Sequence, residues 1–431
     1  MAVFKKGSKK VLNAWAFYDW ANSVYSLTIV SAVFPLFIGA YLKSLNIHTI
    51  TVFGGAISHT ALMTYVTAFG FLVVAVLSPI LSGIADYKGN KKFFLRFFCY
   101  LGSLSCVGLY FFSISYIYFS LLLYVLALIG FWGSLVFYNS YLPDIAYKEQ
   151  QDAISAKGYA MGYIGSVILL LINLAMIMLA PKENALVMMR CSFVLVGIWW
   201  FVFSHYTYKY LPNLKNDNTV TKHVFLNGFK ELKSVWFELQ TQLRLKIYLS
   251  AFFVYSMAVQ TVMLVASFFG ENEIEWEASG IDKTLGLIIS ILIIQIIAVF
   301  GAFLTSFISE KIGNIKTLII INFIWVLICI GAYFVVTPYG FFITAGIVGI
   351  VMGGIQSLSR STYAKFLPET KDTTSYFSFY DVAEKIGIVI GMGIFASVEV
   401  ITGSMRQAIL FLVAFFVLGV VILFRVPKKT K

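Results

Sequence analysis

The feature that most constrains this chain is a series of twelve long apolar segments separated by mostly short polar connections. About 20 apolar residues are needed for one helix to cross a bilayer, so twelve crossings require about 240 such residues. Hydrophobic residues make up 60% of the 431 residues and charged residues only 12%. This composition excludes a soluble enzyme, a secreted disulfide scaffold and a disordered chain, and it predicts an all-α integral membrane protein. The predicted spans are 14–42, 61–85, 93–115, 117–142, 155–180, 186–209, 246–270, 284–308, 316–337, 339–361, 375–401 and 404–426.

Lysine and arginine are distributed unequally between the two sides of these spans. With spans of alternating direction, 26 of the 32 Lys and Arg fall on the side of both termini, 5 fall on the other side, and Lys385 lies within a span. Because cytoplasmic loops carry an excess of positive charge, we predict that both termini are cytoplasmic. The short loops predict a multi-pass protein of the plasma membrane, the cell inner membrane. The net charge of +12 is explained by this bias and does not indicate nucleic-acid binding.

Two pairs of polar motifs indicate an internal repeat. "SGIADYKGNKK" places Asp86 and Gly89 after the second span, and "SFISEKIGNIK" places Glu310 and Gly313 after the eighth, 224 residues later. "YLPD" and "FLPE" end spans four and ten, 225 residues apart. The repeat predicts two six-helix bundles of the same orientation. The predicted units are an N-terminal bundle at 1–209, a linker at 210–245 and a C-terminal bundle at 246–431.

The linker carries an apolar residue every three or four positions, with lysines elsewhere around the same helix. This pattern predicts a cytoplasmic amphipathic helix that lies at the membrane surface and ties the two bundles together. A site for a regulatory partner is the alternative. The stripe consists of Phe225, Phe229, Leu232, Trp236, Leu239 and Leu243.

The two-bundle arrangement resembles the major facilitator superfamily. In the motif that this superfamily carries after its second helix, Asp86 and Gly89 match and Lys92 belongs to the basic tail. Ser82 replaces the first glycine, and Tyr87 stands at a position that is usually basic. The resemblance implies that Asp86, Gly89 and Lys92 act in gating, by contacts between the bundles that form in one state and break in another. The repeat extends this role to Glu310 and Gly313.

Other segments resemble one branch of that superfamily more specifically. They are "WAFYDWANSVYSLTI" (15–29), "VFYNSYLPDIA" (136–146), "GYAMGYIG" (158–165) and "GGIQSLSRSTYAKFLP" (353–368). These segments resemble the vacuole-effluxer-like branch, which is named after fungal vacuolar proteins that export amino acids. The resemblance implies a twelve-helix transporter and suggests an amino acid as its substrate.

Polar residues share one face of the first predicted span. Asp19, Asn22, Ser23 and Ser26 stand at positions i, i+3, i+4 and i+7. An ionised carboxylate in the membrane is costly unless it is paired, and it usually faces the bundle interior or water. Asp19 and Asn22 therefore contribute to a substrate or proton site, or Asp19, only about 7–8 Å into the span, pairs with a neighbouring loop.

Span eleven carries charges of both signs. Asp381, Glu384 and Lys385 share one helical face, and Glu384 lies about 14 Å into the span, near the midplane. These side chains are too costly to face lipid, so they face other helices or a water-filled cavity. There a carboxylate and an ammonium can bind a zwitterion or carry a coupling proton. The alternative is an internal salt bridge that fixes helix packing.

Span ten and two other spans provide further candidates. Gln356 and Arg360 share a face of span ten, with Arg360 about 31 Å from its outer end, at the inner mouth. Arg360 either pairs with a loop carboxylate as a gate or follows the positive-inside rule. Tyr138 and Asn139 in span four and Gln260 in span seven are weaker candidates, because single polar residues in membrane helices often make only an interhelical hydrogen bond.

Several classes of activity are excluded. The chain has no GxxxxGK[ST] motif, which disfavours an ATP-driven pump. The spans contain no Ser/His, paired-Asp or His-cluster arrangement, and the four cysteines and four histidines are scattered. We therefore expect no catalytic residue, no metal and no cofactor. The expected partners are a small solute, protons and the lipid bilayer, and we expect a monomer to function.

The sequence thus predicts a secondary active transporter of a small polar solute that works by alternating access, around a midplane site lined by spans one, four, seven, ten and eleven. An amino acid is the leading substrate, because span eleven offers both charge signs and the resembled branch includes amino-acid exporters. Proton coupling would use Glu384, Asp381 or Asp19. The alternatives are a drug or peptide-fragment exporter of the same fold and a lipid-translocating protein.

Overall fold

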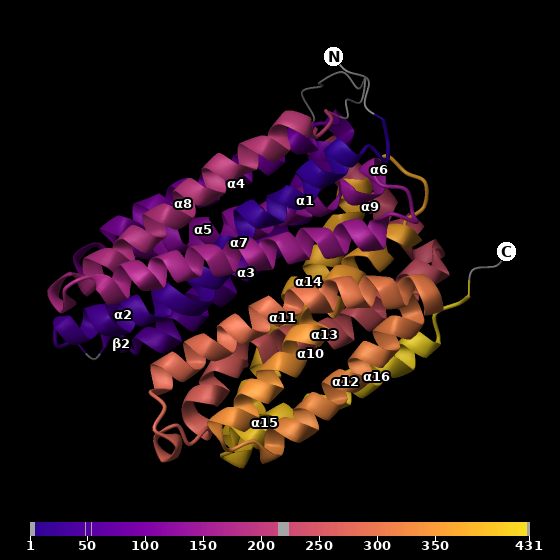
Figure 1. Ribbon diagram of the computed structural model, residues 1–431. Helices are drawn as coiled ribbons and strands as arrows, with labels where there is room; N and C mark the ends of the chain where they lie inside the picture. The colour runs from indigo at the N-terminus through magenta and orange to yellow at the C-terminus, as the bar shows by residue number, and fades with distance from the viewer. Residues whose placement is uncertain (1–4, 48, 53, 214–223, 429–431) are drawn as a thin grey trace.

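The computed structural model describes residues 5–47, 49–52, 54–213 and 224–428, without the side chains of 224–228, and it is almost entirely helical (Figure 1). Within these residues, twelve helical segments are long and apolar enough to cross a membrane, which confirms the predicted fold class. The helices of the first half are α1 (Lys9–Val24), α2 (Val33–Ser44), α3 (His59–Lys88), α4 (Lys91–Gly108), α5 (Ile117–Asn139), α6 (Leu142–Ile145), α7 (Gln151–Leu179) and α8 (Ala185–Tyr210).

Eight α-helices follow among the described residues of the remainder of the chain. They are α9 (Val224–Thr241), α10 (Leu243–Glu273), α11 (Lys283–Ile312), α12 (Asn314–Phe334), α13 (Pro338–Phe366), α14 (Thr373–Thr402), α15 (Met405–Phe411) and α16 (Val413–Phe424). We call α10–α16 the second half.

Two local features were not predicted. The first span is not one regular helix, because a π-helical segment, Tyr25–Ala32, separates α1 from α2. π-Helical turns are rare and often occur at functional sites. After α2, the strands β1 (Ile50–Val52) and β2 (Gly55–Ile57) pair antiparallel as a short hairpin.

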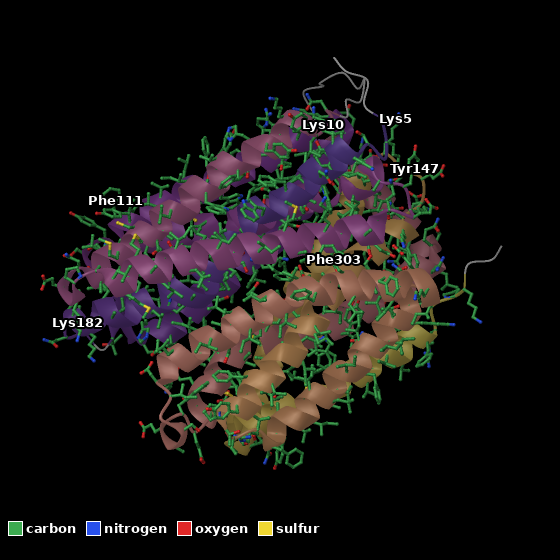
Figure 2. All side chains as sticks on the ribbon, viewed as in Figure 1. Lys5, Lys10, Phe111, Tyr147, Lys182 and Phe303 are labelled. Carbon is green, nitrogen blue, oxygen red and sulfur yellow. The ribbon has the colours of Figure 1, made fainter. Side chains whose placement is uncertain are left out.

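The two halves lie side by side and both chain termini lie at one end of the molecule (Figure 1). We call this the termini end. The halves adjoin there and diverge toward α2 and α15 at the opposite end. Helix α3 packs on α14, and α7 packs on α11 and α13, so these helices form the seam between the halves. Lys5 and Lys10 lie at the termini end and Lys182 at the opposite end, as spans of alternating direction require (Figure 2).

Large apolar side chains cover the outer surface of the helices. Phe303 of α11 is 48% exposed and Leu104 of α4 is 65% exposed. In water such a surface would be costly, but a lipid bilayer solvates it. The charged side chains of Asp381, Glu384 and Lys385 in α14 are instead turned inward, to the seam.

The linker contains α9, which packs along α3 and also contacts α14 and α10. The face that is buried differs from the predicted stripe. Leu239 is buried and the Trp236 ring lies 5.4 Å from that of Phe379, but Phe229 is 57% exposed and Val235, outside the stripe, is buried. Helix α9 packs along α3, so its buried face includes Val235 as well as Leu239. The side chain of Phe225 lies outside the described residues.

Close helix contact in the second half depends on glycine. A Cβ atom at Gly301 of α11 would collide with the backbone of Ile350 in α13. We expect Gly301→Val to destabilise the fold by about 1–3 kcal/mol, as overpacking does, and to lower the thermal unfolding midpoint in detergent. Gly331→Val in α12 is the matched control, because nothing lies within 4 Å of that position. Equal midpoints for the two variants would contradict this account of the α11–α13 contact.

Candidate functional site

Helix α14 brings three of its four charged side chains together at the seam. The Lys385 ammonium lies 3.0 Å from Asp381 Oδ1 and 2.6 Å from Glu384 Oε2. Its Nζ is also 3.6 Å from the centre of the Trp132 ring of α5, and Gln260 of α10 donates to Glu384 Oε1 at 2.8 Å. We call Trp132, Gln260, Asp381, Glu384 and Lys385 the Lys385 cluster. Three helices from both halves therefore build it.

The three charged groups of this cluster are covered to different degrees. The Lys385 side chain is 0% exposed, that of Asp381 7% and that of Glu384 18%. Asp381 also accepts a hydrogen bond from Ser78 of α3 at 3.1 Å, so it is held from both halves. Glu384 lies eleven residues after Thr373, about 16 Å along α14. It is the charged group of the cluster that remains most open to a solute.

A second cluster surrounds Arg360 of α13. The guanidinium lies 3.3 Å from Asp19 Oδ2 of α1, and the pair is almost fully buried. Arg360 also donates to Asn139 Oδ1 at 3.2 Å and to Ser155 Oγ at 2.9 Å. The Tyr138 hydroxyl donates to the same Asp19 oxygen at 2.8 Å. Asp19, Tyr138, Asn139, Ser155 and Arg360 form what we call the Arg360 cluster, which joins the first half to the second.

Aromatic faces complete the surroundings of Arg360. Its guanidinium carbon lies 4.2 Å from the centre of the Tyr159 ring and 4.8 Å from that of Trp15. Cation–π contacts of this kind stabilise a desolvated cation. Arg360 is therefore a buried interhalf residue and not a surface charge at the inner mouth. Its partner Asp19 lies in helix α1 and not in a loop, and the gating role of Arg360 stays a prediction.

The remaining candidates lie near these clusters in different settings. The Gln356 Oε1 atom accepts from the Tyr163 hydroxyl of α7 at 2.6 Å, which is another contact between halves. Asn22 is buried beside Ser23, whose hydroxyl donates to Asn22 Oδ1 at 3.3 Å. Among the described residues, Asn22 Nδ2 has no hydrogen-bond partner. Asn22 faces the interior of the first half, directly before the π-helical turn.

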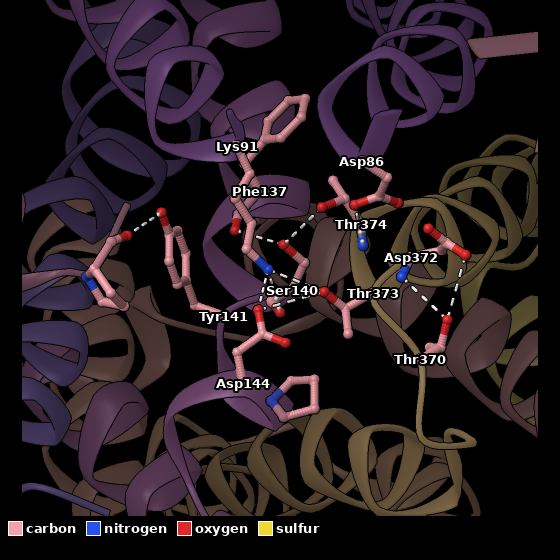
Figure 3. A network of polar contacts seen from close by, with 12 residues as sticks. Asp86, Lys91, Phe137, Ser140, Tyr141, Asp144, Thr370, Asp372, Thr373 and Thr374 are labelled. Carbon is pink, nitrogen blue, oxygen red and sulfur yellow. Dashed lines mark hydrogen bonds and ion pairs between the residues drawn. The ribbon is translucent and has the colours of Figure 1, made fainter. Parts of the chain in front are cut away.

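A polar network closes the seam at the termini end (Figure 3). The Asp86 carboxylate at the end of α3 accepts from the backbone N–H groups of Thr374 and Ser375, at 3.2 and 2.6 Å. Lys91 pairs with Asp144 and donates to the Thr373 hydroxyl at 2.9 Å. Asp86 thereby satisfies the N-terminal donors of α14, which α14 does not cap itself.

A second network at this end was not predicted from the sequence. Asp152 at the start of α7 pairs with Lys365 of α13. It also accepts from Ser309 of α11 at 3.2 Å and from Asn314 of α12 at 2.9 Å. One buried carboxylate of the first half thus contacts three helices of the second half.

The predicted gating residues divide into two groups. Gly89 has a φ of 63° and ends α3, and Lys92 donates to the Leu211 carbonyl of the linker at 2.8 Å. Glu310 is exposed and has no hydrogen bond or ion pair among the residues that the structure describes, so its gating role stays a prediction. Its neighbour Ser309 points to the seam instead, and one residue is about 100° of helix rotation. Gly313, with a φ of 90°, connects α11 to α12.

These contacts are confined to one end of the seam. Among the described residues, the hydrogen bonds and ion pairs between the halves involve positions no more than about 12 residues, or about 18 Å, from the termini end. The polar contacts thus hold the halves together at the termini end alone, which we call the closed arrangement.

Comparisons with known proteins agree over nearly the whole chain. A family model described as "Vacuole effluxer Atg22 like" matches residues 7–431. The chain is 32% identical over 428 residues to the "Uncharacterized MFS-type transporter YxiO" of Bacillus subtilis, covering 97% of this chain and 95% of that protein. It is 23% identical over 482 residues to Autophagy-related protein 22-1 of Aspergillus terreus, covering 87% of this chain and 76% of that protein.

Solved transporter structures share the fold. The E. coli fucose:proton symporter FucP has a TM-score of 0.69 at 14% identity and covers 97% of this chain and 98% of its own. A structure of FucP in the outward conformation has a TM-score of 0.68, also at 14% identity, and covers 97% of this chain and 99% of its own. At this identity the likeness concerns the fold alone.

The structure distinguishes the two acids that the repeat made equivalent. We expect Asp86→Asn to weaken the closed arrangement, because a neutral amide is a poorer acceptor for the N-terminal donors of α14. Glu310→Gln, the matched control, should change nothing. Spin labels at the exposed Asn90 and Lys316, one in each half, report the separation at the termini end. The prediction fails if the two variants give the same distance distribution as the unsubstituted pair.

A further prediction concerns Glu231 of α9. Burial and the neighbouring carboxylates of Asp372 and Asp86 raise the pKa of Glu231 to about 7. A raised pKa means that protonation favours this arrangement, and that this contribution is lost as the pH rises through about 7. We expect the same spin-label pair to show a smaller closed fraction at about pH 8 than at about pH 6. Glu231→Gln should flatten this dependence, and an unchanged slope in that variant would refute the assignment.

Proposed function

The chain belongs to the Atg22-like vacuole effluxer family and has the major facilitator superfamily fold, and on this premise we propose that it is a secondary active transporter of a small zwitterionic solute, an amino acid or a close relative. The family and the fold are those of transporters and not of enzymes. The observation that carries the substrate class is the Lys385 cluster, which presents an ammonium, two carboxylates, an amide and an indole ring at one place in the seam.

The chemistry of this cluster matches both ends of a zwitterion. Lys385 can bind a substrate carboxylate, and Glu384 and the face of Trp132 can bind a substrate ammonium. Without substrate these groups satisfy one another, which keeps a buried charge from remaining unpaired. A zwitterion exchanges these internal contacts for equivalent ones to itself, so binding does not leave a charge without a partner.

The two carboxylates are proposed to have different roles. Asp381 is fixed by Lys385 and by Ser78 across the seam, so it positions the ammonium. Glu384 is less covered and has Gln260 as a neutral partner, so it is the group that faces the solute and the candidate carrier of a coupling proton. Gln356 and Asn22 are proposed to line the same path.

We assign the termini end to the cytoplasm because 26 Lys and Arg lie on that side against 5 on the other. On this assignment the closed arrangement is the outward-facing state, which is the conformation stated for the similar FucP structure. The Arg360 cluster, Asp86 and Lys91 act as the cytoplasmic gate. Alternating access then requires these interhalf contacts to break while the halves rock about the central site.

The setting follows from the same features. The chain is a multi-pass membrane protein, proposed to lie in the plasma membrane with both termini in the cytoplasm. Both polar clusters are built from helices of one chain, so one copy supplies every group that the proposed site needs. This supports a functional monomer.

Counterflow in proteoliposomes tests the substrate class. Vesicles preloaded with a mixed amino-acid pool are given labelled amino acids, with wild type beside Lys385→Ala. We expect labelled amino acid to enter vesicles that contain the wild type. The initial rate of uptake should fall at least about tenfold with Lys385→Ala, because a charge-assisted hydrogen bond contributes about 1.5–3 kcal/mol. Lys43→Ala, an exposed lysine at the opposite end, should behave as wild type.

Two additional measurements keep this test decisive. Lys385→Ala leaves two carboxylates facing each other, which is itself unfavourable. Glu384→Gln is therefore a second variant, which retains the shape of the site and replaces the charged carboxylate by a neutral amide. Correct insertion is checked by thermal unfolding of each purified variant. If wild type inserts correctly and moves none of the labelled amino acids, the amino-acid substrate is wrong. Transport of labelled phospholipid between leaflets, or of a broad range of hydrophobic drugs, would then favour the corresponding alternative.

A further inference from the structure

A pocket of about 640 Å³ opens at the termini end, outside the proposed transport site. Its wall is shared between the halves, since it includes the turn after α3, the "YLPD" turn of the first half and the "FLPETKDT" turn of the second. Figure 3 shows the polar network around it, with Asp86, Lys91 and Asp144 from one half and Thr373 from the other. A volume of this size is typical of sites for small ligands.

The charges in the pocket wall leave an excess of cations. Asp144 is paired with Lys91, and Asp86 accepts from the N-terminal donors of α14. Lys148 and Lys371 are exposed, line the pocket from opposite halves, and have no hydrogen bond or ion pair among the described residues.

Two more charged groups complete the wall. Lys6 also lines the pocket, and within the described part of the chain its ammonium donates only to the neutral Pro143 carbonyl, at 2.7 Å. The wall contains four lysines, Lys6, Lys91, Lys148 and Lys371, and three carboxylates, Asp86, Asp144 and Glu369. It thus carries one net positive charge, and the exposed lysines on its two sides favour an anion.

An unpartnered buried group points to the same place. Gln151, the first residue of α7, lines the pocket and is 2% exposed. Its Nε2 atom donates to the Ala146 carbonyl, but its Oε1 atom has no partner among the described residues. A buried acceptor without a partner is costly, and a ligand that carries a hydrogen-bond donor removes this cost.

We propose that this pocket binds a phosphate-type anion that carries a protonated oxygen, and that the anion stabilises the closed arrangement. Lys6 and Lys148 of the first half and Lys371 of the second hold its negative oxygens. The protonated oxygen donates to Gln151 Oε1. Because the halves supply cations from both sides, separating them at the termini end dismantles the site. The bound anion therefore favours closure, and this effect does not depend on which solute the protein transports.

Purified full-length protein in neutral detergent is titrated with inorganic phosphate and pyrophosphate at constant ionic strength. We expect a saturable rise in the thermal unfolding midpoint, since a ligand that binds only the folded protein stabilises it. The Asn90–Lys316 spin-label pair should shift toward its shorter distances. Lys148→Ala/Lys371→Ala should weaken the apparent Kd by at least about tenfold, because each charge-assisted hydrogen bond is worth about that much.

Controls separate this site from general effects of salt. Lys43→Ala/Lys182→Ala removes two exposed lysines from the opposite end and should leave the titration unchanged. Chloride at matched ionic strength should have no effect. Gln151→Leu should weaken binding of phosphate more than binding of sulfate, which has no protonated oxygen at neutral pH.

The source of the anion is settled by a second arm in nanodiscs. An effect of soluble phosphate in discs of neutral lipid assigns the site to a cytosolic solute, whereas an effect that requires lipids with phosphate-monoester headgroups assigns it to the membrane. Either result supports the proposal if it is lost in the Lys148/Lys371 double variant. A response that persists in that variant, or no response to any of these anions, overturns it. None of these outcomes tests which substrate the protein transports, because no transport is measured.

Discussion

The Arg360–Asp19 ion pair illustrates the constraint on which the rest of the structure depends. Both partners are buried and come from different halves. A charge at this depth is unfavourable unless it has a partner, so the halves cannot separate in a dry interior. They can separate only if water enters and solvates both groups. The ion pair therefore links closure of the seam to exclusion of water, and it makes the closed and open arrangements distinct states rather than a continuum.

The seam is polar where it closes, and this composition suits a contact that must be reversible. An apolar seam would resist opening in proportion to the area exposed. Opening a seam that is held by ion pairs and hydrogen bonds costs less free energy, because water replaces each partner when the halves separate. Asp152 with Lys365 and Asp86 with the start of α14 are contacts of this kind. The Lys385 cluster lies deeper along the same seam. In the proposed mechanism, a solute bound there is next to the contacts whose breaking releases it.

The twelve spans and the charged face of α14 could be predicted, because hydropathy and helical periodicity are local properties of the sequence. The partners of that face could not. Trp132 is one aromatic residue among many in its span, and only the mutual rotation of α5 and α14 places it over Lys385. The Asp19–Arg360 pair joins residues 341 positions apart. The protein neighbours of the linker helix could not be predicted for a related reason, since the position of α3 decides which side of α9 is buried.

The two halves of the internal repeat differ in how the N-termini of the corresponding helices α14 and α7 are complemented. Helix α14 has no acidic residue in its first turn, so its N-terminal donors and dipole are complemented by Asp86 from the other half. Helix α7, its counterpart in the first half, carries Asp152 in its own first turn. An acid from the partner half is then unnecessary at α7, and Glu310 is free to face outward while Asp152 reaches across to Lys365. The N-termini of α7 and α14 thus each have one carboxylate nearby, and the two are supplied by different elements.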